Sequence, residues 1–81
     1  MELTYRLEIG GPLPRVAQDQ LRERFGDVRV QSYGDRTLVS GLCADQAALR
    51  AMLSLLWDVG VEVRVVEATP LSGRDGKEVR S

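Results

Sequence analysis

The stretch DVRVQSYGDRTLVSGL, residues 27–42, predicts a β-hairpin at the centre of the chain. Val28 and Val30 alternate with polar residues, which is the period of a strand with one buried face. Gly34 begins the turn, because glycine readily adopts the positive φ that tight hairpin turns need. The returning strand is rich in β-forming residues, and we expect Leu38 to be its inward side chain.

An amphipathic helix is predicted on the N-terminal side of this hairpin, in RVAQDQLRERFG at residues 15–26. Ala17, Leu21 and Phe25 recur at four-residue steps, so they share one face of a helix. Gly26 is a suitable residue to end it.

A second helix is predicted on the C-terminal side, in DQAALRAMLSLLWDVG at residues 45–60. Asp45 is a good N-cap, because its carboxylate can accept hydrogen bonds from the first free backbone N–H groups. Gly60 is a good residue to follow the last turn. The apolar stripe that would face the core consists of Leu49, Met52, Leu53 and Leu56.

Two further strands, the first and the last along the chain, complete the pattern: LTYRLEI at residues 3–9 and VEVRVVE at residues 61–67. Both alternate, and their expected inward residues are Leu3, Tyr5, Leu7, Ile9, Val61, Val63 and Val65. The element order β-α-β-β-α-β predicts an α+β ferredoxin-like sandwich, with a four-stranded antiparallel sheet in the order 4-1-3-2 and both helices on one face. We expect one domain over residues 1–69 and a disordered polar tail over residues 70–81.

The composition excludes several classes of function. Eighty-one residues form one small domain, and the net charge of −1 argues against nucleic acid or an anionic membrane as partner. No apolar run is long enough to cross a bilayer. The single cysteine allows no internal disulfide, so a reducing cytoplasm is the expected location.

Residues that carry chemistry are scarce in this chain. There is no histidine, so neither a histidine-based catalytic site nor a histidine metal ligand exists. We therefore expect a protein that is not an enzyme and that uses no metal or cofactor. Cys43 lies before a helix N-terminus, where the helix dipole can activate a thiol, although we favour the interpretation that it is a small buried apolar residue at a strand end. Tyr5 and Tyr33 are the other candidates for an enzyme.

The sheet face opposite the helices is expected to be mostly polar, with Thr37, Val39 and Val66 among its residues. An RNA-binding sheet needs two or three stacking aromatic residues, and only Tyr33 is available there. Arginines and glutamates alternate on this face, which predicts cross-strand ion pairs among Arg6, Glu8, Glu62 and Arg64. Arg29 and Tyr33 suit a protein partner or a second copy, although a purely solvated face fits the same pattern.

The segment TLVSGLCADQAALRAMLSLLWDVGVEVRVV, residues 37–66, resembles a group of small uncharacterised bacterial proteins. Their C-terminal halves share the pattern T-L-x-G-x-x-x-D-Q-A-A-L, followed by D-L-G, and the opening YRLEIGGPLP is similar as well. This motif is structural, since it contains a helix cap, a core stripe and a helix stop. The resemblance implies a bacterial cytoplasmic domain and no specific activity.

The departures from that group concern the second helix. The group tends to carry basic residues where this chain has Leu55 and Trp57, and a histidine where it has Arg50. Two interpretations follow: Leu55 and Trp57 thicken the flanks of a small core, or one of them, with Trp57 favoured, anchors another chain.

The sequence therefore favours a non-catalytic interaction or self-assembly module, either a homodimer or a subunit that docks onto another protein. The expected partner-binding residues are Leu55, Trp57, Arg50, Arg29 and Tyr33, with the edge strand VRVQSY and the second helix as surfaces. One alternative is a sensor of amino acids or nucleotides that resembles ACT-type domains and binds at Gly10 and Gly11. The other is an enzyme of the dimeric α+β barrel kind.

Overall fold

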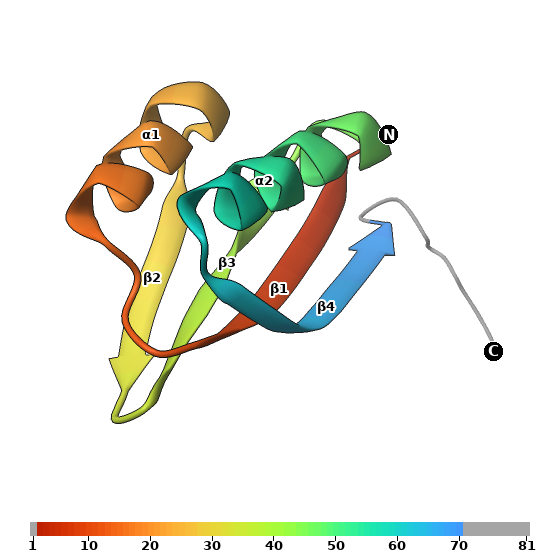
Figure 1. The fold of residues 1–81 in the computed structure, drawn as a ribbon. Coiled ribbons are helices and arrows are strands. Elements are labelled where there is room, and N and C mark those ends of the chain that lie inside the picture. Colours follow the sequence, from red (N-terminus) through yellow and green to blue (C-terminus); the bar gives the residue numbers. More distant parts are fainter. Residues whose placement is uncertain (1, 71–81) are drawn as a thin grey trace, which may run out of the picture.

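A four-stranded antiparallel sheet forms one layer of the computed structural model, and two helices cover one of its faces (Figure 1). The structure describes residues 2–70. The expected polar tail lies outside these residues, except for Pro70, which is the last residue of a strand. The strands are β1 (Leu3–Gly10), β2 (Val28–Tyr33), β3 (Arg36–Cys43) and β4 (Glu62–Pro70), and the helices are α1 (Arg15–Phe25) and α2 (Gln46–Val59).

The strand order across the sheet is β2-β3-β1-β4. Read from the β4 edge, the same order is β4-β1-β3-β2. β1 pairs with β3 on one side and β4 on the other, while β2 and β4 form the two edges. The fold is therefore α+β with a central β1.

The inward face of β1 is buried along its whole length, as the alternation predicts. Leu3, Tyr5, Leu7 and Ile9 are all core residues. The helices cover them with a stripe that consists of Ala17, Leu21, Leu49, Met52, Leu55 and Leu56. At about 25 cal/mol per Å² of buried apolar surface, this single core is the main source of stability.

The prediction for β3 is wrong, because Thr37 and Val39 are the inward residues and Leu38 is not. Thr37 pairs with Ile9 and Val39 pairs with Leu7, and directly paired residues share one face of a sheet. Both are fully buried. The Thr37 hydroxyl donates a hydrogen bond to the Gly11 carbonyl at 2.8 Å, which compensates for the loss of water.

A β-bulge changes the alternation in β4. Val65 pairs with Glu8 and Val63 pairs with Ile9, so Arg64 is an additional residue without a partner in β1. Val65, predicted to be inward, therefore lies on the open face, which is the face of the sheet opposite the helices. Val66, predicted to be outward, pairs with Leu7 and lies on the helix side.

The predicted ends of α2 are confirmed. The Asp45 carboxylate accepts a hydrogen bond from the Ala48 N–H at 2.8 Å. Gly60 adopts φ 90°, a left-handed conformation that side chains disfavour, and its N–H bonds to the last turn. These two residues fix where the helix begins and ends.

Leu55 and Trp57 occupy opposite sides of α2. Leu55 is only 7% exposed and, with Ala51 and Val59, borders the groove between α2 and α1. Trp57 is 60% exposed. Two residues correspond to about 200° of rotation on a helix, so Trp57 points away from α1, toward the β4 edge.

We expect Leu55→Ala to lower the free energy of unfolding by about 2–5 kcal/mol, because it leaves a cavity in the core. Trp57→Ala should lower it by less than about 1 kcal/mol, since most of the ring is in solvent. Urea unfolding followed by circular dichroism, at low protein concentration, measures both. Equal losses for the two variants would contradict this assignment of the helix faces.

Candidate functional site

The helix layer does not cover β4 completely. Val66 lies on the helix side of the sheet but is 47% exposed, and Ala68, which pairs with Tyr5 on the same side, is exposed as well. Figure 1 shows β4 at the edge of the sheet, on the side of α2 that is remote from α1. Trp57 is exposed on this side of α2, so exposed apolar side chains occur on both the helix and the strand here.

We call this region the β4 edge surface: Trp57, Val66, Ala68 and the outer backbone of β4. An edge strand presents unpaired N–H and C=O groups on its outer side. Arg50 is exposed two helical turns before Trp57 and shares its side of α2. The surface thus combines a tryptophan with free strand hydrogen-bonding groups and has an arginine at its border, and tryptophan and arginine are enriched in protein interfaces.

Arg29 and Tyr33, the other predicted partner-binding residues, lie far from this surface on β2, at the opposite edge of the sheet. Both face the open side, since they pair with Ser40 and Arg36. Tyr33 is engaged locally: its hydroxyl donates to Gln31 Oε1 at 3.1 Å, and the Arg36 guanidinium lies 5.8 Å from its ring centre. The predicted residues therefore do not form one site, and burial of Leu55 removes that residue from the accessible surface.

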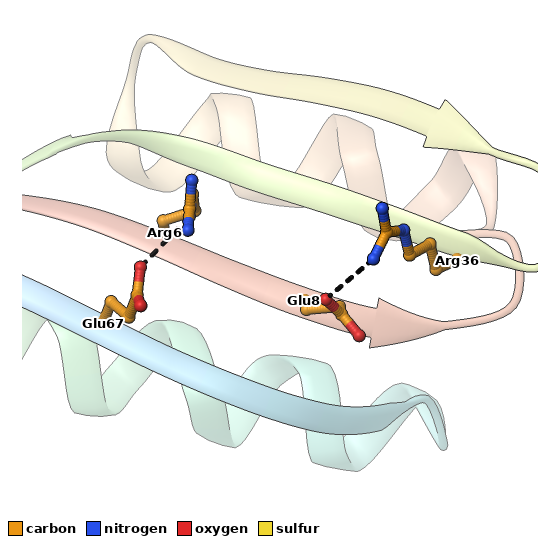
Figure 2. A network of polar contacts seen from close by, with 4 residues as sticks. All are labelled: Arg6, Glu8, Arg36 and Glu67. Carbon is orange, nitrogen blue, oxygen red and sulfur yellow. Dashed lines mark hydrogen bonds and ion pairs between the residues drawn. The ribbon is translucent and has the colours of Figure 1, made fainter.

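Two ion pairs link side chains of neighbouring strands on the open face (Figure 2). Arg6 Nε lies 3.1 Å from Glu67 Oε1, and Arg36 Nη1 lies 3.4 Å from Glu8 Oε1. Both pairs join neighbouring strands. The prediction of cross-strand ion pairs is thus confirmed, but Glu67 and Arg36 are partners that it missed.

The third ion pair on this face lies within β4, between Arg64 Nε and Glu62 Oε1 at 3.3 Å. Its two members were expected to pair across strands. Residues two apart in a strand share one side, so both side chains lie above Gly10. Exposed pairs of this kind contribute between 0 and about 1 kcal/mol each to the free energy of unfolding, so they add little to the stability of the fold.

A groove of about 670 Å³ lies at one end of the open face. It crosses the first residues of β1 and β2 and the last residues of β3. Its lining consists of Thr4, Tyr5, Asp27, Val28, Arg29, Ser40, Gly41 and Leu42. Sequence reasoning did not identify this groove, because it depends on which residues of three strands become neighbours.

Gly10 is the last residue of β1, and Gly11 begins the loop that follows it. A Cβ on Gly10 would lie 2.7 Å from Glu62 Oε1 and 2.8 Å from Arg64 Nε, so only glycine fits without a shift. Gly11 has φ +85°, and its N–H donates to the Asp35 carbonyl at 2.7 Å. Its carbonyl accepts the Thr37 hydroxyl. The backbone groups of Gly11 that a ligand would need are therefore already bonded within the protein.

Tyr5 and Cys43 are neighbours inside the core. Burial, and then the nearby Cys43 thiol, raises the pKa of Tyr5 to about 12. Burial, and then the Asp45 carboxylate, raises the pKa of Cys43, although a hydrogen bond with the Asp45 backbone acts in the opposite direction. The protonated thiol donates to the Asp45 carbonyl at 3.6 Å. Both groups are thus protonated at neutral pH, and activation of Cys43 by the helix terminus is outweighed.

No helix within residues 2–70 is long and apolar enough to cross a membrane. Over the same residues, no three His, Cys, Asp or Glu side chains gather where they could hold a metal ion.

A family model described as a domain of unknown function, DUF8691, matches residues 4–67. The chain belongs to the DUF8691 family. The DUF8691 match begins in β1 and ends in β4, so it includes all or part of each of the six elements, the Trp57 and Val66 of the β4 edge surface, and the groove. It also contains residues 37–66, which carry the resemblance to small bacterial proteins. No curated protein matches the chain.

Tyr5 gives a prediction about pH. Its hydroxyl is buried without a hydrogen-bond partner among the described residues, which costs about 1–3 kcal/mol. We expect Tyr5→Phe to raise the free energy of unfolding by about 1 kcal/mol at neutral pH. Because the folded-state pKa is raised from 10.0 to about 12, the unfolded chain releases the proton first. Wild-type stability should therefore be full below pH 10 and fall as the pH rises from about 10 to about 12.

Denaturant unfolding at several pH values measures this effect, and Tyr33→Phe, at the exposed tyrosine, is the matched control. A phenylalanine side chain cannot ionise, so the Tyr5→Phe variant should lose the part of the alkaline decline that Tyr33→Phe retains. Identical pH profiles for the two variants would show that the Tyr5 hydroxyl is not shielded from water.

Cys43 gives a prediction about reactivity. It is the single thiol of the chain and is buried, so modification requires opening of the core around it. At neutral pH we expect Ellman's reagent to react at least about 100-fold more slowly than with a free cysteine peptide, and at the peptide's rate in denaturant. A fast reaction of the folded protein would instead indicate an activated, accessible thiol.

Proposed function

We propose that this DUF8691 domain is a non-catalytic ferredoxin-like module that self-associates through the β4 edge surface. The observation that carries the proposal is the 60% exposed Trp57 on the β4 side of α2, together with an edge strand in which Val66 and Ala68 are exposed on the helix side. An exposed tryptophan is unfavourable in an isolated monomer, whereas tryptophan is enriched at the energetic centres of interfaces.

The β4 edge is favoured over the β2 edge that the sequence suggested. β4 has nine residues and β2 has six, and proteins commonly protect a free edge by keeping it short. Exposed apolar side chains border β4 on the helix side, whereas the nearest aromatic residue on β2, Tyr33, is engaged with Gln31 and Arg36.

A second copy fits this edge because antiparallel pairing about a two-fold axis uses the same strand twice. Such pairing would continue the sheet from four strands to eight and place Trp57 and Val66 of both copies on one side. Arg64 lies on the N-terminal side of the strand's centre and Glu67 on the C-terminal side. Two-fold pairing centred on Val65 or Val66 brings Arg64 of one copy within one residue of Glu67 of its partner, so the charges are complementary.

The test is the oligomeric state of the full chain, measured by sedimentation equilibrium over a range of concentrations. We expect a reversible dimer for the wild type. Trp57→Ala should weaken the dimer by at least about 30-fold, the effect of a hot spot worth about 2 kcal/mol or more. The control Tyr33→Ala, which removes an exposed aromatic residue from the other edge, should leave the dissociation constant unchanged.

Val66→Arg provides a second variant, because a charge on the helix side of β4 should prevent association while leaving the fold intact. A blue shift of Trp57 fluorescence with rising concentration would support its burial between copies. A wild-type chain that stays monomeric at every concentration, or a dimer weakened only by Tyr33→Ala, would overturn the proposal.

A further inference from the structure

The groove on the open face contains an arginine that takes part in none of the ion pairs described above. Among the described residues, the open-face arginines Arg6, Arg36 and Arg64 each have a carboxylate partner. Arg29 has no carboxylate within ion-pair distance in the same part of the chain, and no other basic residue lines the groove. Its guanidinium is thus available to an anion from solution.

The positions of the neighbouring residues follow from the strand register. Arg29 pairs with Ser40, and Ser40 pairs with Arg6 across the next strand. These three residues therefore form one row across β2, β3 and β1, with neighbouring strands about 4.8 Å apart. Ser40 lies between two arginines, and its hydroxyl can donate to the same anion as Arg29.

The adjacent row supplies an apolar side chain. Leu42 pairs with Thr4, faces the groove and is 47% exposed. Asp27 borders the same end. A guanidinium and a hydroxyl beside an exposed leucine match a molecule in which a carboxylate is attached to an apolar group, since guanidinium binds carboxylates through two parallel hydrogen bonds.

We propose that this groove is a binding site for a small carboxylate with an apolar chain, in which Arg29 and Ser40 hold the carboxylate and Leu42 contacts the chain. The Asp27 carboxylate can accept hydrogen bonds from an ammonium group, so the site also suits a carboxylate ligand that carries an amine. The site does not depend on self-association, since its lining residues come from β1, β2, β3 and the residue before β2.

The experiment is a titration of the ¹⁵N-labelled full chain followed by amide chemical shifts, with ligands at millimolar concentration because the groove is open to solvent. The probes are 4-methylpentanoate, leucine, 3-methylbutylamine and acetate. We expect the first two to shift the amides of Arg29, Ser40 and Leu42. The amine, which lacks the carboxylate, should not shift them, and acetate should bind at least about 10-fold more weakly than 4-methylpentanoate.

Arg29→Gln should weaken binding of 4-methylpentanoate at least about 10-fold, and Arg22→Gln, an exposed arginine on α1, is the matched control with unchanged affinity. The spectra themselves show that each variant is folded. Tighter binding of leucine that Asp27→Asn abolishes would identify the ligand class as amino acids, and equal binding would identify simple carboxylic acids. Absence of shifts with both carboxylates, equal binding of acetate, or affinity unaffected by Arg29→Gln would overturn the proposal.

Discussion

The position of β1 between β3 and β4 is the constraint on which the rest of the structure depends. Directly paired residues of an antiparallel sheet share a face, so the alternation of β1 is imposed on both neighbours. Residues paired with Leu7 point toward the helices, and residues paired with Arg6 or Glu8 point to the open face. The core, the ion pairs and the groove all follow from this assignment.

Sequence reasoning succeeds where the signal is local and fails where it depends on pairing. The alternation of β1 and the caps of α2 are readable from the residues alone. Thr37, Leu38 and Val39 are all compatible with a strand, so nothing local shows which of them is inward, and the pairing with β1 decides. For Leu55 and Trp57, the helical angle was readable, but only the location of α1 shows which one is buried.

The two surfaces proposed for function differ in chemistry and lie on different faces of one sheet. The β4 edge surface is apolar and presents free strand hydrogen-bonding groups, which suit a protein partner. The groove combines charge, hydroxyl groups and one leucine, which suit a small molecule. The Arg6–Glu67 pair lies between them: Arg6 pairs with Ser40, which lines the groove, and Glu67 follows Val66 in β4.

The bulge at Arg64 determines on which faces of the sheet Val66 and Glu67 lie. With uninterrupted alternation, Val66 would face solvent on the open side and Glu67 would lie on the helix side, where a carboxylate is costly to desolvate. One additional residue exchanges the two, so that Val66 lies on the side of Trp57 and Glu67 reaches Arg6. A shift of the bulge to a position beyond Glu67, with no residue lost or gained, would therefore turn Val66 to the open face and Glu67 to the helix side, and would change both surfaces at once.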